Sequence, residues 1–196
     1  MNSNGLLLTA TATATRQRLM TNLLARPAAA DALADPARPV FASLIGGRSL
    51  GEGVLPAGLG LDGKTFEDLW QGYFPGPHLP LVEGRHENIP ELADIERLLL
   101  DYRTGSSSSE AWLARIVAWG CAGHNHLWQD LGLANRQELS LLMNVGFRPL
   151  AALNVGDMKW KKFIYRKFCE RDDIYVCPAP SCGVCVDYAK CFAPED

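Results

Sequence analysis

Apolar residues recur with the period of an α-helix along most of the chain. Between positions 91 and 103 they fall on one helical face, and a broader apolar face runs through 110–121. A third stripe, with spacings of i, i+3, i+4 and i+8, is formed by Trp160, Phe163, Ile164 and Phe168. Sustained strand-like alternation is absent, apart from a possible short strand at Ile174–Val176. The pattern therefore predicts a mainly α fold, an irregular helical domain.

The first ninety residues have a weaker pattern. Residues 5–26 predict a helix, although their alternating threonines and alanines also suit a strand. A short helix at 40–45 is expected to stop at Gly46 and Gly47. Another is expected to begin with Thr65 as its N-cap. Glycines and prolines favour loops between these helices.

The segments that join the later helices carry recognisable signals. A serine-rich run at 104–109 is expected to be a flexible link that ends in a capping box formed by Ser107 and Glu110. Pro149 is expected in an irregular connector, and Asp157 is expected to cap the last helix, at 158–170.

The length suits one domain with an attached tail. Residues 1–170 predict a helical domain, in which 1–90 are variable and loop-rich and 91–170 form a helical core. Residues 171–196 are interpreted as a cysteine-rich, cluster-binding tail packed on that domain. Since 47% of the residues are hydrophobic, the domain is expected to fold without depending on a metal.

Charge and hydropathy argue against several classes of function. The net charge of −3 gives no sign of a nucleic-acid partner. No apolar run approaches the roughly 20 residues of a membrane span. Leu6, Leu7 and Leu8 follow no basic residue, unlike a secretory signal. We therefore expect no nucleic-acid or membrane partner and a cytoplasmic location, where clustered cysteines bind metal more often than they form disulfides.

Four of the six cysteines form a C-x4-C-x2-C-x5-C motif near the C-terminus, made up of Cys177, Cys182, Cys185 and Cys191. Thiolate sulfur is a soft donor that suits zinc and iron–sulfur clusters. Only one C-x2-C element is present, whereas zinc ribbons usually have two. The first three spacings match plant-type ferredoxins, but the fourth cysteine is too close for that fold. The spacing therefore predicts a metal site and leaves zinc and an iron–sulfur cluster open.

Other thiols and imidazoles are candidate ligands with simpler alternatives. Cys169 suits a small buried residue or a fifth ligand, and Cys121 is interpreted as core. His124 and His126 lie in a stretch that either continues the preceding helix or starts a new one. They suit a polar helix end, or nitrogen ligation or proton handling at a metal that is held mainly by the cysteines. Asp130, four residues after His126, is expected to orient that imidazole.

Basic residues surround the apolar stripe of the last helix. The candidates for contacts to an oxyanion or a partner are Lys159, Lys161, Lys162 and Arg166. In the simpler alternative they form the solvated face of an amphipathic helix. In the functional one they create a local positive field that attracts an oxyanion, compensates an anionic cluster or docks an acidic protein.

Three stretches of the C-terminal half together resemble the NifQ family of nitrogen-fixation proteins. They are His126-Leu-Trp-Gln-Asp-Leu-Gly132, Met158-Lys-Trp-Lys-Lys-Phe-Ile-Tyr-Arg-Lys-Phe-Cys-Glu170 and the four-cysteine motif followed by Phe192. The resemblance implies that the four cysteines hold an iron–sulfur cluster able to take up molybdenum. It also implies that the partners are the nitrogenase cofactor-assembly scaffold, NifEN, and its reductase, NifH.

The sequence and the resemblance together predict a cluster carrier that binds molybdate or a molybdenum–iron–sulfur species and donates molybdenum to iron–molybdenum cofactor assembly. No enzymatic turnover of an organic substrate is expected, and no nucleotide-binding or hydrolase motif occurs. Two alternatives remain. One is a zinc-stabilised protein-interaction module, and the other is an iron–sulfur electron-transfer protein.

Overall fold

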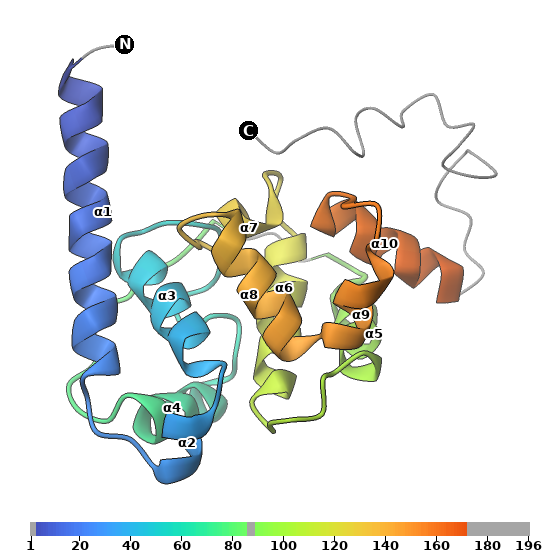
Figure 1. The fold of residues 1–196 in the computed structure, drawn as a ribbon, viewed down its shortest axis with the longest axis horizontal. Coiled ribbons are helices and arrows are strands. Elements are labelled where there is room, and N and C mark those ends of the chain that lie inside the picture. Colours follow the sequence, from blue (N-terminus) through green and yellow to red (C-terminus); the bar gives the residue numbers. More distant parts are fainter. Residues whose placement is uncertain (1–2, 86–88, 172–196) are drawn as a thin grey trace.

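The computed structural model describes residues 3–85 and 89–171, and all regular structure in these two segments is helical (Figure 1). The helices are α1 (Ser3–Leu24), α2 (Ala30–Ala34), α3 (Arg38–Ser49), α4 (Gly63–Tyr73), α5 (Leu92–Asp101), α6 (Glu110–Cys121), α7 (Leu127–Asp130), α8 (Arg136–Gly146), α9 (Arg148–Leu153) and α10 (Trp160–Arg171). The mainly α prediction is confirmed there, and the weakly patterned stretch at 5–26 is helix α1. The possible strand at Ile174–Val176 and the four-cysteine motif lie outside the described residues.

Helix α6 is the centre of the fold. Most of its apolar residues are buried: Leu113, Ile116 and Val117 are fully buried, and Trp112 and Trp119 are partly buried. Burial of each such side chain contributes about 1.5–3 kcal/mol. Helices α5, α7 and α8 pack against α6, and α10 packs against α5. Figure 1 shows α1 along one side of the molecule, beside α3, and α10 on the opposite side.

The loop-rich first part and the later helices share one hydrophobic core. Aromatic side chains join them: the ring of Phe41 in α3 lies 5.3 Å from that of Tyr73 in α4, edge to face. Tyr73 in turn lies 5.9 Å from Trp112 in α6. Such edge-to-face pairs add about 0.5–1.5 kcal/mol to the burial of their area.

The serine-rich run at 104–109 is not the flexible link that was predicted, because two buried carboxylates hold it. Glu110 accepts hydrogen bonds from the backbone N–H groups of residues 105, 106 and 107, at 2.7–3.1 Å. The Ser107 and Ser109 hydroxyls donate to Asp35, at 2.6 and 2.7 Å. The predicted capping box is thus half correct, since Glu110 reaches the N–H of Ser107 while the Ser107 hydroxyl binds Asp35 instead.

Two other predictions fail at helix termini in the first part of the chain. Helix α3 continues past Gly46 and Gly47 to Ser49, because Gly47 serves close packing and not termination. A Cβ at Gly47 would lie 2.1 Å from the carbonyl oxygen of Gly132. Helix α4 begins at Gly63, and its N-cap is Asp62, whose carboxylate accepts from the N–H of Thr65 at 3.0 Å.

The segment before α10 also differs from the prediction. Pro149 lies in the first turn of α9, where its missing N–H costs nothing, so this part is helical. Asp157 does not cap the last helix, which begins at Trp160. Asp157 instead has a φ of 49°, in the left-handed region, and closes a tight turn by donating its N–H to Asn154 O at 3.1 Å.

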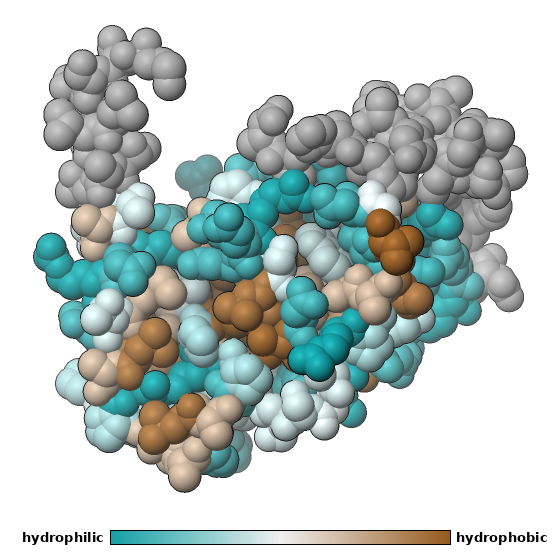
Figure 2. Space-filling model, in the orientation of Figure 1, coloured by the Kyte–Doolittle hydropathy of each residue, from teal (hydrophilic) through white to brown (hydrophobic). Residues whose placement is uncertain are grey.

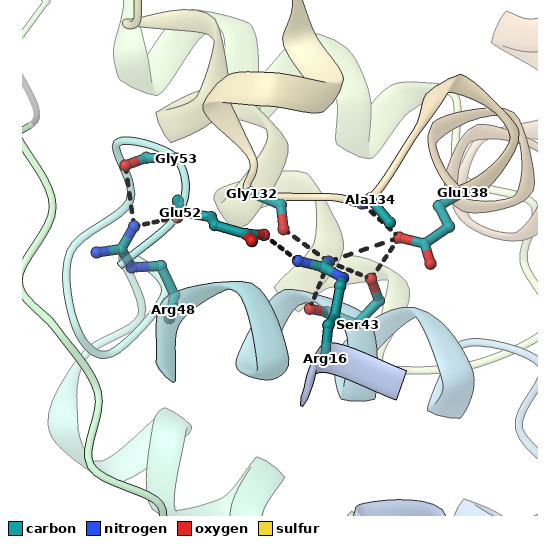
Figure 3. A network of polar contacts seen from close by, with 8 residues as sticks. All are labelled: Arg16, Ser43, Arg48, Glu52, Gly53, Gly132, Ala134 and Glu138. Atoms are coloured by element: carbon teal, nitrogen blue, oxygen red, sulfur yellow. Dashed lines mark hydrogen bonds and ion pairs between the residues drawn. The ribbon is translucent and has the colours of Figure 1, made fainter. Parts of the chain in front are cut away.

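Two buried arginines fix the loop after α3 (Figure 3). Arg16 in α1 donates to the main-chain oxygens of Ser43 and Gly132, at 3.0 and 2.7 Å, and pairs with Glu52. Arg48, which is fully buried, donates to main-chain oxygens of the 52–53 turn and of Val82. The loop after α3 is therefore held against the segment that follows α7.

Among the described helices, none combines the length and the apolar character required to cross a membrane.

The carboxylate of Asp35 yields a prediction about stability. Burial raises its pKa, but hydrogen bonds from Ser107, Tyr73, Ser109 and the Ala37 N–H outweigh burial, so the pKa lies below its ordinary value. We expect Asp35→Ala to lower the free energy of unfolding at pH 7 by about 3 kcal/mol, because charged hydrogen bonds are lost and hydroxyls are left unpaired. Urea denaturation followed by circular dichroism measures this change.

Urea denaturation at lower pH tests whether the charge of the Asp35 carboxylate causes this stabilisation. The ionised Asp35 stabilises the fold fully above its unfolded pKa of about 4, and this contribution is lost as the pH falls through the lower folded pKa. The difference between the wild type and Asp35→Ala should therefore narrow on acidification. Asp68→Ala, at an exposed ion pair, is the control and should change stability by less than about 0.5 kcal/mol. A difference that is constant with pH would contradict the role of the charge.

Candidate metal centre

The described residues contain part of the candidate site and exclude another part. The motif cysteines Cys177, Cys182, Cys185 and Cys191 lie outside them. His124, His126, Cys169 and the basic residues of α10 lie within them. Within segments 3–85 and 89–171, no three histidine, cysteine or acidic side chains are arranged to hold a metal ion.

The turn that carries the two histidines is anchored to α10. Lys161 donates from Nζ to the carbonyl oxygen of Gly123 at 2.7 Å and forms an ion pair with Asp130. The side chain of Lys161 is 16% exposed and that of Asp130 only 1%. Asn125 adds two hydrogen bonds to the same carboxylate, from its N–H at 2.9 Å and from Nδ2 at 3.1 Å. The turn and the first half of α10 thus meet at Asp130.

Glycine at position 123 is required by this contact. A Cβ there would lie 2.3 Å from the Asp130 carboxylate, so any side chain would displace the carboxylate from Lys161. The structure also decides between the two alternatives for this stretch: α6 ends at Cys121 and a new short helix, α7, begins at Leu127. Gly120 packs closely against Leu131, which lets α7 fold back on α6.

The predicted orientation of His126 by Asp130 is wrong. His126 is the N-cap of α7 and has an extended backbone (φ −62°, ψ 148°), and its i, i+4 contact with Asp130 is made by the backbone, from the Asp130 N–H to the His126 carbonyl oxygen at 3.0 Å. The carboxylate binds Asn125 and Lys161 instead. The His126 N–H donates to Gln129 Oε1 at 3.1 Å, and its side chain is half-buried, whereas His124 is exposed.

The apolar stripe of α10 is buried as predicted, but its basic residues do not form one solvated face. Lys161 points inward to Asp130. Lys167 and Arg166 both pair with Glu170, at 2.7 Å. Lys162 is exposed and Lys159 is half-buried. Much of the positive charge of α10 is therefore matched by carboxylates of the chain itself, which weakens the case for an oxyanion site on this helix.

The two described cysteines have different environments. Cys121 is buried, as predicted, and burial raises the pKa of its thiol to about 12, against the lowering effect of Lys161. Cys169 is half-buried and packs against the core. It follows Lys161 by eight residues, which places it about 12 Å further along the helix axis. Among the described residues, Cys169 and the two histidines are not assembled into a three-ligand group.

The functional reasoning from sequence missed the polar groups around Asp130. An open groove of about 430 Å³ lies beside it, lined mainly by the 52–54 and 125–133 segments. Trp128 lines this groove, and its indole N–H is buried with no hydrogen-bond partner among the described residues. The available signal was the run from His126 to Gly132, in which Asp130 was assigned to His126 and not to Lys161.

The Lys161–Asp130 pair yields a second prediction. Lys161→Met keeps the aliphatic stem but leaves the Asp130 charge buried with only Asn125 as its partner. We expect the free energy of unfolding to fall by about 3 kcal/mol or more, as for other broken buried pairs. The double variant Lys161→Met, Asp130→Asn should lose less than the sum of the two single variants, since neither charge is then left alone.

Urea denaturation followed by helical circular dichroism measures both effects. Lys64→Met is the control, because the side chain of Lys64 is 84% exposed in its ion pair with Asp68. It should change the free energy of unfolding by less than about 0.5 kcal/mol. If Lys161→Met were as mild as this control, α10 would not depend on Asp130 for its position.

Comparison with known proteins places these features in a family. Residues 40–193 match the family model of NifQ, a range that includes all four motif cysteines. The chain is 38% identical over 160 residues to the protein NifQ of Azotobacter vinelandii, covering 74% of this chain and 82% of the relative. It is 42% identical over 147 residues to the protein NifQ of Rhodobacter capsulatus, covering 74% and 81%.

A NifQ homolog of Sinorhizobium fredii is 38% identical over 146 residues, covering 72% of this chain and 64% of the relative. No solved structure matches the chain significantly. The family match and the length of these alignments lead to one conclusion: the chain belongs to the NifQ family.

Proposed function

We propose that this protein is an iron–sulfur carrier that binds molybdenum as cargo and donates it to the assembly of the iron–molybdenum cofactor. Membership of the NifQ family supports a role in nitrogen fixation. The observation that carries the finer proposal is the C-x4-C-x2-C-x5-C motif at 177–191, inside the segment matched to the family.

The donor set fits this group. Four thiolates within a short segment suit an iron–sulfur cluster, and sulfur ligands also suit a second soft metal bound beside it. The motif must supply most of the binding, because Cys121 stays protonated near neutral pH and is enclosed by the core. Cys169, His124 and His126 remain proposed additional ligands, and the exposed His124 and half-exposed His126 are accessible for that role.

The helical domain supports the motif by fixing where the tail begins. Lys161 ties the first half of α10 to Asp130, and near its end Arg171 lies 3.7 Å from Asp101 of α5. Cys177 follows Arg171 by only six residues in the sequence. In this proposal the domain holds the carrier segment at a defined place.

As a carrier the protein has no catalytic turnover of its own, and its location is the cytoplasm. The proposed partners are the cofactor-assembly scaffold, NifEN, and its reductase, NifH. Lys159, Lys162 and Arg166 are proposed to attract molybdate or the acidic surface of a partner. The ion pair of Arg166 with Glu170 is exposed, whereas Lys161 has a structural role because it is paired with the buried Asp130.

Metal analysis of anaerobically purified protein tests the proposal. Iron, acid-labile sulfide and molybdenum should be present together, and Cys182→Ala or Cys185→Ala should lose nearly all of the iron and molybdenum. Both variants should keep the helical circular dichroism signal, because the large core of the domain does not depend on a cluster.

Cys121→Ala is the matched control, since it also removes one thiol, and its iron content should equal that of the wild type. A protein that contains zinc alone would overturn the proposal in favour of a zinc-stabilised interaction module. Iron with no molybdenum, in cells supplied with molybdate, would favour electron transfer. Global unfolding of the motif variants would show that the cluster is needed for the fold.

A further inference from the structure

The connection between α9 and α10 presents an apolar side chain on a rigid turn. Val155 is 93% exposed, more than any other large hydrophobic residue in segments 13–85 and 89–171, where the structure describes side-chain burial. It occupies the second position of a tight turn that is closed by the hydrogen bond from the Asp157 N–H to Asn154 O, at 3.1 Å. We call residues 153–157 the Val155 turn.

The side chain of Asn154 makes the turn rigid. It accepts from the N–H of Met158 and donates to the carbonyl oxygen of the same residue, both at 2.9 Å. Met158 is buried, so the far end of the turn is fixed in the core. The N–H of Asn154 donates to Ala151 O at 3.1 Å and joins the turn to α9. A side chain on a turn held in this way loses little conformational freedom when it enters a pocket of a partner.

Two more exposed apolar side chains lie at the end of α9 and in α8. Leu153 at the end of α9 is 47% exposed, and Leu141 in α8 is 45% exposed. Figure 2 shows hydrophobic surface over α8 and over the α9–α10 connection, separated and bordered by hydrophilic side chains. Exposed apolar side chains bordered by polar ones are typical of protein–protein contact surfaces.

The charge around the turn indicates the chemistry of the partner. Residues 148–171 contain seven basic and two acidic residues, a net charge of +5 in a chain whose total is −3. Lys161 and Arg171 pair with Asp130 and Asp101, which lie outside this range, so the segment together with these partners keeps a net charge of +3. Arg148, exposed at the start of α9, and Lys159, directly after the turn, flank it in the chain. Two copies of this positive surface would repel each other, whereas an acidic surface would be attracted. A separate, acidic partner therefore fits better than a second copy.

We propose that the Val155 turn is the docking element for the protein that receives the metal, and that the partner offers an apolar pocket edged by carboxylates. The choice of the recipient rests on the proposed function. The turn leads directly into α10 and so to the cysteine motif, and docking there brings the recipient to the helix from which the carrier segment emerges.

Equilibrium binding to the purified cofactor-assembly scaffold tests the docking, and metal analysis of the same samples keeps it separate from the carrier function. Val155→Asp should raise the Kd about tenfold or more, the effect of losing an interface anchor. Its iron and molybdenum contents and its helical signal should be unchanged, because the side chain contacts almost nothing in the domain. The binding should also weaken as salt is raised, and less steeply for Arg148→Glu.

Leu33→Asp in α2 is the matched control, since Leu33 is also an exposed apolar residue, at 55%, and its Kd should be that of the wild type. A Kd for Val155→Asp equal to that of the wild type would overturn the proposal, whatever the metal content. Loss of metal from Val155→Asp would overturn the proposal in favour of a role in the metal site. A wild-type dimer that Val155→Asp dissociates would overturn it in favour of self-association. If the wild type lacked molybdenum but its binding required Val155, the carrier function would fail and the docking site would stand.

Discussion

The buried carboxylate of Asp130 determines how the functional half of the molecule is arranged. Its side chain binds Lys161 from α10 and Asn125 from the turn before α7, and its main-chain oxygen accepts from the N–H of Val54 at 2.8 Å. A carboxylate that is 1% exposed must keep its partners, because an uncompensated charge in the interior costs several kcal/mol. The three segments therefore cannot separate independently, and the position of α10 follows from the position of Asp130.

Buried charged side chains also hold the glycine-rich and proline-rich loops of this fold. Arg48 and Asp35 use buried charge to collect main-chain and hydroxyl groups from segments that are distant in sequence. Arg16 precedes the part of the chain that matches the family model, yet it binds the carbonyl oxygens of Ser43 and Gly132 within that part. Apolar packing fixes the helices of this protein, and charged side chains fix its loops.

This division explains what the sequence predicted. The helices at 92–101, 110–121 and 160–171 were predictable because burial of one face decides them, and that face is visible as a spacing of apolar residues. The loops were not, because their partners are far away: Ser107 binds Asp35, 72 positions earlier, and Gly47 lies against Gly132. For the same reason the spacing in α10 revealed its buried stripe but not that Lys161 would turn inward to Asp130.

The candidate site shows the same limit and also a consequence for function. The motif cysteines were evident from their spacing. The pairing of His126 with Asp130, predicted from their separation of four residues, was wrong because Asp130 binds Lys161, 31 positions further along the chain. The described cysteines, one buried and one half-buried, are positioned by their contacts with the core. In the proposed function, the cysteine motif binds the metal and the helical domain fixes the position of the segment that carries the motif. A carrier needs this separation, because it can release its metal without disturbing the surface that its recipient recognises.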